Sequence, residues 1–513
     1  MKPTEINTPP GTQAVGYAKL ILDHQLAVFP PAQQSFVARA ALSEHHGPGS
    51  VRVVYPPQYA PGDTDVEQLE FALKHDGVCL DVLAAYFQKR GAAVEPELVA
   101  HIRSKPTGMF VRRLWFFYEW LTGRTLPLDD MTTGNYQPVL DPKLYLTSKS
   151  NVRIRRQRLV DNLLGGPALC PVIRQSASLQ SFVALDLAAS ASKLVDGYGA
   201  VAIRRAVSCL YSRETRSSFE IEREHPENRR VDRYIAMLER VAQTAALDEA
   251  ALVVIQNETV DPRYAEPTFR SEQNYVGQTL GFREKVHYLP PRPEDVRSLM
   301  DGWFACAQRL AKSDIDPVVH AAVLSFTFVF IHPFIDGNGR MHRLIVHQVL
   351  SSRGFTPLGL IFPVSAVILD RRQEYDDALE SFSRPLMAMV NYDLDDAGKV
   401  TVAEDTSLLY RFPDLTRFAE DLYRWVQATI QKDFKFELDF VVAYEKTERR
   451  MREVLDMPDK KRRLFILVAS SNAGRLSKAK RAQFSELSDA EVAALEAVVQ
   501  EHMPDLAGAA LLI

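Results

Sequence analysis

The feature that most constrains this chain is a polar, glycine-rich segment at residues 332–343, set between two apolar stretches. The residues on either side are apolar enough for buried helices. The segment itself holds two histidines, one aspartate, two glycines, one asparagine and two arginines. A buried helical region rarely interrupts itself with so many polar groups unless they line a site.

The segment has the residues that end one helix and start another. Pro333 lacks an N–H and disfavours a helical residue before it, so His332 is predicted at a helix C-terminus, facing a cavity. Gly337 and Gly339 are both expected in a tight turn with positive φ. A second helix is predicted from about Asn338, and its first N–H groups carry the positive end of the helix dipole.

The chemistry of the segment suits a polyphosphate. Free N–H groups at a helix start bind anions, and Arg340 and Arg343 share a face of the same first turns. Asp336 is the expected Mg²⁺ ligand, because Mg²⁺ takes one or two carboxylates and completes its shell with water and phosphate oxygens. His332 can accept a proton from an incoming hydroxyl. The segment therefore predicts a nucleoside triphosphate site with a general base.

Plainer readings exist for each residue alone. A GNG triplet is a weak signal, and a single histidine on an apolar helix is more often a core residue. The ordered run of seven polar or glycine positions favours a site over packing. A metal site made by His332, His342 and His347 is disfavoured, because the last two are five residues apart and do not share a helix face.

The string HPFIDGNGRMHR resembles the signature of the Fic (Fic/Doc) family, HPFx[D/E]GNGRxxR, and matches it at every specified position. The resemblance implies a mainly α fold with a helical core and a short β-hairpin flap. It also implies transfer of AMP from ATP to a Ser, Thr or Tyr hydroxyl of a target protein, with Mg²⁺ as cofactor. Carried over by residue, the roles are general base for His332, Mg²⁺ ligand for Asp336, anion nest for Gly337, Asn338 and Gly339, and phosphate ligands for Arg340 and Arg343.

Two more positions resemble parts of that family. The stretch 279–291, TLGFREKVHYLPP, alternates like a hairpin around Gly281. It lies where the family has a flap that aligns the target protein by strand addition, although an ordinary surface hairpin would look the same. Tyr375 lies where family members line the nucleotide pocket, and packing on a helix is the alternative.

The stretch 215–224, TRSSFEIERE, resembles the family's inhibitory motif [S/T]xxxE[G/N], with Ser218 and Glu222 in the specified places. The resemblance implies a helix that presents Glu222 to Arg343 and blocks the seat of the γ-phosphate. A carboxylate aimed into a phosphate site neutralises the arginine and repels the nucleotide. Arg223 stands where the family has Gly or Asn, and a solvated charged helix is the alternative reading.

The chain is predicted to have three consecutive regions. Residues 1–180 form an accessory region, residues 181–400 the Fic-like core, and residues 401–513 a C-terminal helical region that resembles a winged-helix module. Within the accessory region, residues 35–45 have a helical pattern, and residues 66–125 are predicted to be largely helical.

The C-terminal region raises the possibility of a DNA partner. Lys478, Lys480 and Arg481 are candidate phosphate contacts. A solvated basic face explains them equally well, because no clear recognition helix is visible.

Composition limits the other classes. The 513 residues are 46% hydrophobic with a net charge of −4, which permits a large core and does not favour a general nucleic-acid binder. The four cysteines lie far apart, so neither a zinc site nor a disulfide framework is expected. No signal-peptide pattern is visible, and the most apolar stretch is too short to span a bilayer. A cytoplasmic protein with no membrane partner is expected.

Three functions remain open. The first is an AMP transferase inhibited by Glu222. The second uses the same site to remove AMP or to transfer another phosphate-containing group. The third is a DNA-binding regulator whose core senses a nucleotide. The sequence does not specify the oligomeric state. A homodimer is one assembly compatible with each of these functions.

Overall fold

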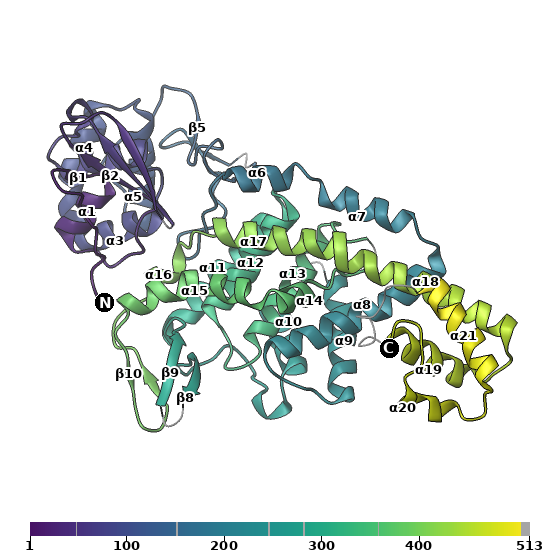
Figure 1. The fold of residues 1–513 in the computed structure, drawn as a ribbon. Helices are drawn as coiled ribbons and strands as arrows, with labels where there is room; N and C mark the ends of the chain where they lie inside the picture. The colour runs from purple at the N-terminus through teal and green to yellow at the C-terminus, as the bar shows by residue number, and fades with distance from the viewer. Residues whose placement is uncertain (48, 150–151, 245–246, 281–282, 358, 504–513) are drawn as a thin grey trace. The chain divides into compact units, whose positions relative to one another are not determined.

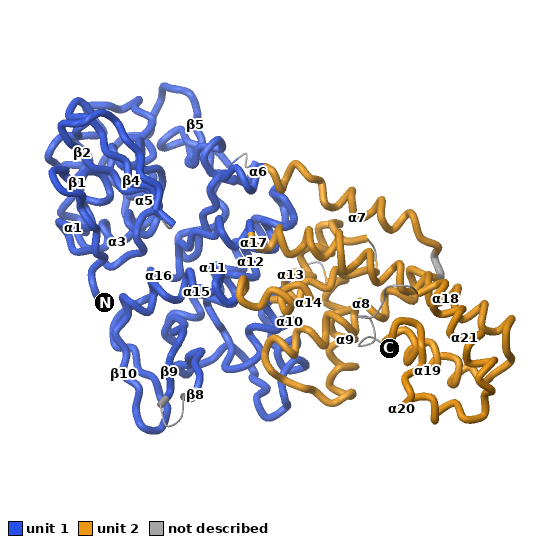
Figure 2. Tube along the Cα trace, viewed as in Figure 1, with its two compact units in different colours: residues 1–180, 246–342, 376–420 blue, residues 181–245, 343–375, 421–513 orange. Residues whose placement is uncertain are grey.

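The computed structural model describes the chain except for residues 48, 150–151, 245–246, 281–282, 358 and 504–513. The fold is mainly helical with small sheets, as predicted (Figure 1). Two compact units are distinguished in Figure 2: unit 1 comprises residues 1–180, 246–342 and 376–420, and unit 2 comprises residues 181–245, 343–375 and 421–513. Each unit combines separate segments of the chain, whereas the sequence predicted three consecutive regions, and that division stays a prediction.

The start of unit 1 contains a four-stranded sheet that sequence analysis missed. Its strand order is β1-β2-β4-β3, with β2 and β4 parallel and the outer pairs antiparallel. The strands are β1 Gln13–Val15, β2 Gln33–Val37, β3 Ser43–Gly47 and β4 Ser50–Tyr55. The helix expected at 35–45 is wrong, because this stretch supplies most of β2 and the start of β3. Pairing of β2 with β4 outweighs the helical preference of the alanines that follow β2 in the sequence.

Helices pack against this sheet around one large apolar core that includes Tyr17, Trp115 and Phe117. The largely helical character expected of residues 66–125 is confirmed. The helices and short turns are α1 Tyr17–His24, η1 Pro57–Tyr59, α2 Asp65–His75, α3 Leu80–Arg90, η2 Gly91–Val94, α4 Glu95–Ser104 and α5 Met109–Thr122.

The rest of unit 1 adds short strands and the helices that carry the signature. The strands are β5 Gln137–Pro138, β6 Arg153–Ile154, β7 Leu159–Val160, β8 Val276–Leu280, β9 Arg283–Tyr288, β10 Asp393–Leu394 and β11 Val400–Thr401. The helices and turns that lie wholly in it are α10 Glu249–Thr259, η3 Pro262–Tyr264, α11 Pro293–Ala311, α12 Pro317–Ile331 and α16 Leu408–Arg411.

Four helices contribute residues to both units. They are α6 Ala177–Val183, α13 Asn338–Ser352, α15 Arg372–Met389 and α17 Thr416–Ala428.

The hairpin expected around Gly281 is present. Strands β8 and β9 pair in antiparallel fashion as a two-stranded sheet. Gly281 and Phe282, in the connection between them, lie outside the described residues. The hairpin is followed closely by α11. Pro290 and Pro291 end the β-pairing, and Pro293 is the first residue of the helix.

Helix α12 is buried on all sides and leads into the signature. Asp316 caps its N-terminus, because its carboxylate accepts hydrogen bonds from the N–H groups of Val318 (2.8 Å) and Val319 (3.3 Å). The residues from Val318 to Ile331 are all buried. A helix that is apolar all round belongs in a protein core, so α12 is a rigid support for the residue at its end.

Unit 2 is helical in its described part. Its helices are α7 Leu187–Asp196, α8 Ala200–Ile221, α9 Asn228–Gln243, α14 Val364–Asp370, a π-helical segment η4 Thr429–Phe434, α18 Lys435–Val454, α19 Asp459–Ser470, α20 Lys478–Arg481, η5 Ala482–Phe484 and α21 Asp489–His502. Helix α8 packs against α9, α14 and α18. Among residues 402–503 every described element is helical, so the strands of a winged-helix wing are not found there.

No helix in the described residues is both long enough and apolar enough to cross a membrane.

Candidate active site

His332 ends α12 in a left-handed conformation, with φ 52° and ψ 59°. This position at the helix C-terminus was predicted from Pro333. The ring Nδ1 lies 3.1 Å from the carbonyl oxygen of Val329. A carbonyl oxygen can only accept, so Nδ1 carries the proton and Nε2 keeps the lone pair. The half-buried imidazole is therefore oriented with its basic nitrogen away from its own helix.

Arg270 holds the backbone at His332 and was not found by sequence analysis. Its Nε donates to the carbonyl of His332 (2.8 Å), and its backbone N–H donates to the carbonyl of Pro333 (2.8 Å). Its Nη2 donates to the carbonyl of Pro291, directly after the β8–β9 hairpin (2.5 Å). Burial lowers the pKa of Arg270 to about 10, so it stays charged at neutral pH. No local motif marks this arginine, because its side-chain partners are backbone carbonyls, and those of Pro291 and His332 lie far along the chain.

Three further side chains hold the turn after His332. The carboxylate of Glu266 accepts from the N–H of Ile335 (2.7 Å). Asn274 donates to the carbonyl of Phe334 (3.0 Å), and Gln256 donates to the carbonyl of Asp336 (3.3 Å). Each satisfies a backbone group that the turn leaves without a helical partner. Sequence analysis missed them for the same reason as Arg270.

Gly337 is the one glycine of the signature with a positive φ, at 90°. A Cβ there would come 2.9 Å from a methyl of Val260, so the position is closed to other residues both by backbone strain and by space. The expectation for Gly339 is wrong. Gly339 lies inside α13, and helical backbone has a negative φ.

Asn338 closes the turn at the start of α13. Its Oδ1 accepts from the N–H of Phe334 (3.1 Å), and its Nδ2 donates to the carbonyl of Phe334 (2.7 Å). The side chain is almost completely buried. Its role in shaping the backbone is therefore visible, whereas the anion-nest role of Gly337, Asn338 and Gly339 stays a prediction.

Asp336 lies at the mouth of the turn beside Arg340. Its carboxylate oxygens lie 3.2 and 3.3 Å from Nη2 of Arg340, and Oδ1 accepts from the N–H of Gly337 (2.6 Å). Its side chain is 42% exposed, whereas that of Arg340 is 2% exposed. One partly exposed carboxylate beside a buried arginine fits Mg²⁺, which needs only one or two protein oxygens when phosphates supply others.

Unit 2 contains the ion pair that the inhibitory motif implied. Nη2 of Arg343 lies 2.8 Å from Oε1 of Glu222. Nη2 also donates to the carbonyl of Ser218 (2.8 Å), and Nε donates to its hydroxyl (3.0 Å). The arginine side chain is only 2% exposed. The pairing of Glu222 with Arg343 was predicted, whereas the two contacts of Ser218 with the same arginine were not.

The electrostatics of Arg343 follow from this pairing. Burial by itself lowers the pKa of the guanidinium, but the Glu222 carboxylate, with contributions from Tyr375 and Tyr234, outweighs burial and raises the pKa above its ordinary value. Nη1 has no hydrogen-bond partner among the described residues. Arg343 is therefore a permanent cation that is partly satisfied by protein groups.

Helix α8 ends at Ile221, Glu222 is its C-cap, and a left-handed residue follows. The N–H of Glu224 donates to the carbonyl of Phe219, and that of Arg223 donates to the carbonyl of Glu220 (3.0 and 2.9 Å). This is the Schellman arrangement, which requires a left-handed residue after the helix. Arg223 takes that role with φ 59°. The geometry explains why Gly or Asn suits the position better than Arg.

Tyr375 is buried in unit 2 and packs against Trp425, with ring centroids 5.7 Å apart. Tyr375 contributes to the raised pKa of Arg343, and its contact with a nucleotide stays a prediction.

Residues 246–350 match the Fic/DOC family. The chain is also 36% identical over 90 residues to the protein adenylyltransferase Fic of Drosophila sechellia, and 37% identical over the same length to that of Drosophila yakuba. Each match covers 18% of this chain and 16% of the relative. Residues 246–350 therefore form a Fic/DOC-family domain, and the chain matches about a sixth of the length of these relatives.

Solved structures of the family have low overall similarity to this chain. A Fic family protein from Desulfovibrio desulfuricans G20 is 21% identical, covers 61% of this chain and 85% of its own, and has a TM-score of 0.36. Residues 134–508 of Fic-1 from C. elegans are 14% identical, cover 72% of this chain and 96% of their own, and have a TM-score of 0.29. Scores at this level add nothing to the argument from the domain match.

Replacing Arg223 with Gly is expected to stabilise the end of α8. The substitution relieves a left-handed non-glycine residue, a gain of about 1 kcal/mol. The free energy of unfolding from denaturant titration measures it. Arg233→Gly, on an exposed turn inside α9, is the matched control and is expected to lose about 1 kcal/mol. Equal losses for both variants would contradict the role of the Arg223 backbone.

Proposed function

We propose that this chain transfers AMP from ATP to a Ser, Thr or Tyr hydroxyl of a target protein, and that Glu222 inhibits the transfer by occupying Arg343. The observation that carries the proposal is the construction of the signature. It places an oriented histidine at the end of one helix and two buried arginines on the first turns of the next. The match to the Fic family and the relatives named as adenylyltransferases support it.

The reaction assigns one role to each group. The target hydroxyl oxygen attacks the α-phosphorus of ATP, and its proton passes to Nε2 of His332. The new bond joins the hydroxyl oxygen to phosphorus, and the bond between the α-phosphorus and the bridging oxygen breaks, so that pyrophosphate leaves. Arg340 and Arg343 hold the phosphate charges. Catalysis then depends mainly on positioning and on fixed positive groups.

Asp336 is the residue that would hold Mg²⁺, together with phosphate oxygens. The ion would neutralise charge on the polyphosphate when bound. Arg340 neutralises the same carboxylate at 3.2 Å, so metal and nucleotide binding would have to loosen that contact.

Inhibition follows from the single cation that two anions must share. The Glu222 carboxylate takes the Nη2 side of Arg343 at 2.8 Å, and a phosphate of ATP needs the same guanidinium. A carboxylate there repels the nucleotide as well as filling the place. The Glu222 side chain is 35% exposed, so it can leave toward solvent.

The β8–β9 hairpin is the proposed docking edge for the target protein. It has only two strands, so each strand has one edge that is not paired within the sheet. An extended segment of a target can add to such an edge through backbone hydrogen bonds, independent of its side chains. Arg270 links the end of this hairpin to the backbone of His332, so the docking edge and the base share one support.

A second partner is suggested by charge near the C-terminus. Residues 449–481 hold eleven Lys or Arg and three Asp or Glu, a net charge of +8 in a chain of net −4. Six of these cations are exposed and form no hydrogen bond or ion pair through their side chains among the described residues: Arg449, Lys460, Arg463, Arg475, Lys478 and Lys480. We propose that this basic segment binds the phosphate backbone of duplex DNA.

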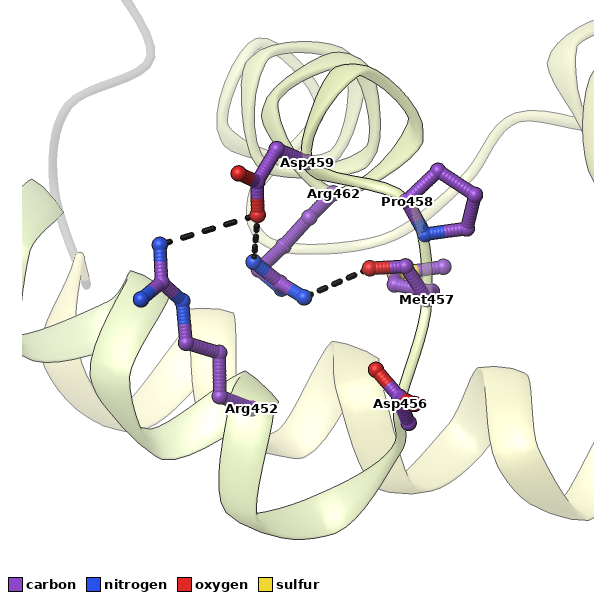
Figure 3. A pocket seen from close by; sticks show the side chains of 6 residues that line it. All are labelled: Arg452, Asp456, Met457, Pro458, Asp459 and Arg462. Atoms are coloured by element: carbon purple, nitrogen blue, oxygen red, sulfur yellow. Dashed lines mark hydrogen bonds and ion pairs between the residues drawn. The ribbon is translucent and has the colours of Figure 1, made fainter.

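Contacts gather the basic segment around the first turn of α19. Arg452, at the end of α18, lies 3.6 Å from Asp459, and Arg462 lies 2.6 Å from the same carboxylate oxygen. Figure 3 shows both arginines directed at Asp459. All three side chains line a pocket of about 600 Å³. Lys461 lies 2.7 Å from Glu486, which follows η5. Cations from α18 and α19 are therefore neighbours, and α19 contacts the segment that follows α20.

A duplex is favoured over a single strand by the lack of stacking groups. The aromatic residues of 449–501 are Phe465 and Phe484, and both are fully buried. Single-strand binding normally relies on exposed aromatic side chains that stack on bases.

Glu222→Gly is expected to raise incorporation of labelled AMP from ATP into the chain itself, in the presence of Mg²⁺, by about tenfold or more. Removing the carboxylate frees Arg343 to bind a phosphate, and a tenfold gain corresponds to a free energy of ~1.4 kcal/mol. Mass spectrometry should find one added AMP unit. Glu220→Gly, an exposed glutamate on the same helix turn, is the control and should give no gain. A folded Glu222→Gly variant with no more incorporation than the parent would refute the proposal.

His332→Ala in the Glu222→Gly background is expected to reduce AMP transfer by about 10²–10⁴-fold through loss of the general base. Nucleotide affinity measured by calorimetry should change little, since His332 is not a phosphate ligand in this scheme. His46→Ala, on the exposed strand β3, is the control. Transfer that survives the loss of His332 would show that another group takes the proton.

Lys478→Ala with Lys480→Ala is expected to weaken binding of a labelled 20-base-pair duplex and to reduce the slope of log K against log salt by about 2, at roughly 0.9 per lost phosphate contact. Fluorescence anisotropy at several salt concentrations measures both quantities. Lys143→Ala with Lys312→Ala is the control pair. Binding to anionic lipid vesicles but not to the duplex would assign the basic segment to membranes instead.

A further inference from the structure

We propose that a buried cluster of Glu214, His347 and Ser365 fixes the register of α8 along α13, and that this register aims Glu222 at Arg343. This cluster is called the register node below. The inference rests on the proposed inhibition by Glu222 and extends it to residues that no signature contains. All the residues involved belong to unit 2.

The register node joins three helices. Nε2 of His347, on α13, lies 2.8 Å from Oε1 of Glu214, on α8. The backbone N–H of Ser365, in the first turn of α14, donates to Oε2 of Glu214 (2.8 Å), and its hydroxyl donates to Oε1. The exposed fractions are 3% for His347, and 1% and 0% for Glu214 and Ser365. One carboxylate thus caps α14 and contacts α13 at the same time.

The carboxylate cannot leave this position easily. Burial raises the pKa of Glu214, but His347 and the two groups of Ser365 outweigh burial and bring the pKa below its ordinary value. The native arrangement therefore stabilises the charged form. Removing a partner from a buried charge is strongly unfavourable, because no water replaces it. The node consequently resists sliding of α8.

The spacing of the residues along α8 and α13 determines how the two helices are aligned. Glu214, Ser218 and Glu222 follow one another at four-residue intervals on α8, and Arg343 and His347 are four apart on α13. Residues four apart lie one helical turn apart on the same face. Glu214 meets His347, whereas Ser218 and Glu222 meet Arg343, so the numbering rises on one helix as it falls on the other. A slip of one turn, about 5.4 Å, would break both sets of contacts.

The two ends of this face differ in strength. At the Glu222 end the carboxylate is 35% exposed and is followed by the left-handed Arg223. At the Glu214 end every group is buried. Opening is therefore expected to begin at Glu222 while the register node stays closed. Glu214 and His347 are positioning residues that act through Glu222.

His347→Leu tests the node. It removes the contact of α13 with Glu214 and should raise self-incorporation of labelled AMP about fivefold or more, within the usual range of coupling between sites. His347→Gln, which keeps an N–H donor toward Glu214, should stay near the parent. In the Glu222→Gly background, His347→Leu should add nothing, because its only effect is on Glu222. A merely structural role would instead change activity by the same factor in both backgrounds.

The outcomes separate this inference from the proposed function. If Glu222→Gly gives no gain, the proposed function fails. If Glu222→Gly gains but folded His347→Leu matches the parent, the register inference fails and the proposed function stands. Should His347→Leu not fold, Glu214→Gln with His347→Leu carries the same expectation, because it leaves no buried charge and keeps an acceptor for Ser365.

Hydrogen exchange gives a second measurement that leaves the node intact. The amides of α8 around Glu214 should be equally protected in the parent and in Glu222→Gly, and protection should fall only near the end of the helix. Loss of protection along the whole of α8 in Glu222→Gly would overturn the inference, since Glu222 would then be holding the node rather than the reverse.

Discussion

The turn at Gly337 is the constraint on which the site depends. Its backbone lies so close to Val260 that no side chain fits, and its φ of 90° is strained for other residues. The turn sets how far the end of α12 lies from the start of α13. It is held from outside by side chains that bind backbone groups, Arg270 among them. A histidine and an arginine-bearing helix start are therefore kept together by packing rather than by the functional residues themselves.

The second constraint on the molecule is the pairing of buried charged side chains along α8. One face of this helix presents Glu214, Ser218 and Glu222 in successive turns, and these groups meet a histidine and an arginine of α13. Burying so much charge is costly unless every group has a partner. In the proposed scheme, the contact that inhibits the site and the contacts that hold the two helices in register come from one face of α8, so regulation and folding would share residues.

The sequence was sufficient for the signature but not for its supports. Pro333 and Asn338 predicted where one helix ends and the next begins, because proline and helix start signals act locally. Gly339 was assigned a turn role that only Gly337 has, since two glycines in one motif look alike until φ is known. Arg270 and Glu214 were not singled out, because their partners lie far along the chain and include backbone groups that any residue provides. The strand at Gln33–Val37 was missed for a similar reason: its partner strand, not its composition, decides its form.

The near-complete burial of Arg343 has a thermodynamic consequence. A guanidinium with 2% exposure cannot rely on water when its carboxylate leaves, so the pair opens readily only when another anion arrives. Closure and ligand capture then become linked equilibria. If the closed form lowers the affinity for the incoming anion by some factor, binding of that anion must disfavour the closed form by the same factor. Under the proposed inhibition the Glu222–Arg343 pair therefore favours the closed form, and the ligand concentration sets how often the pair opens.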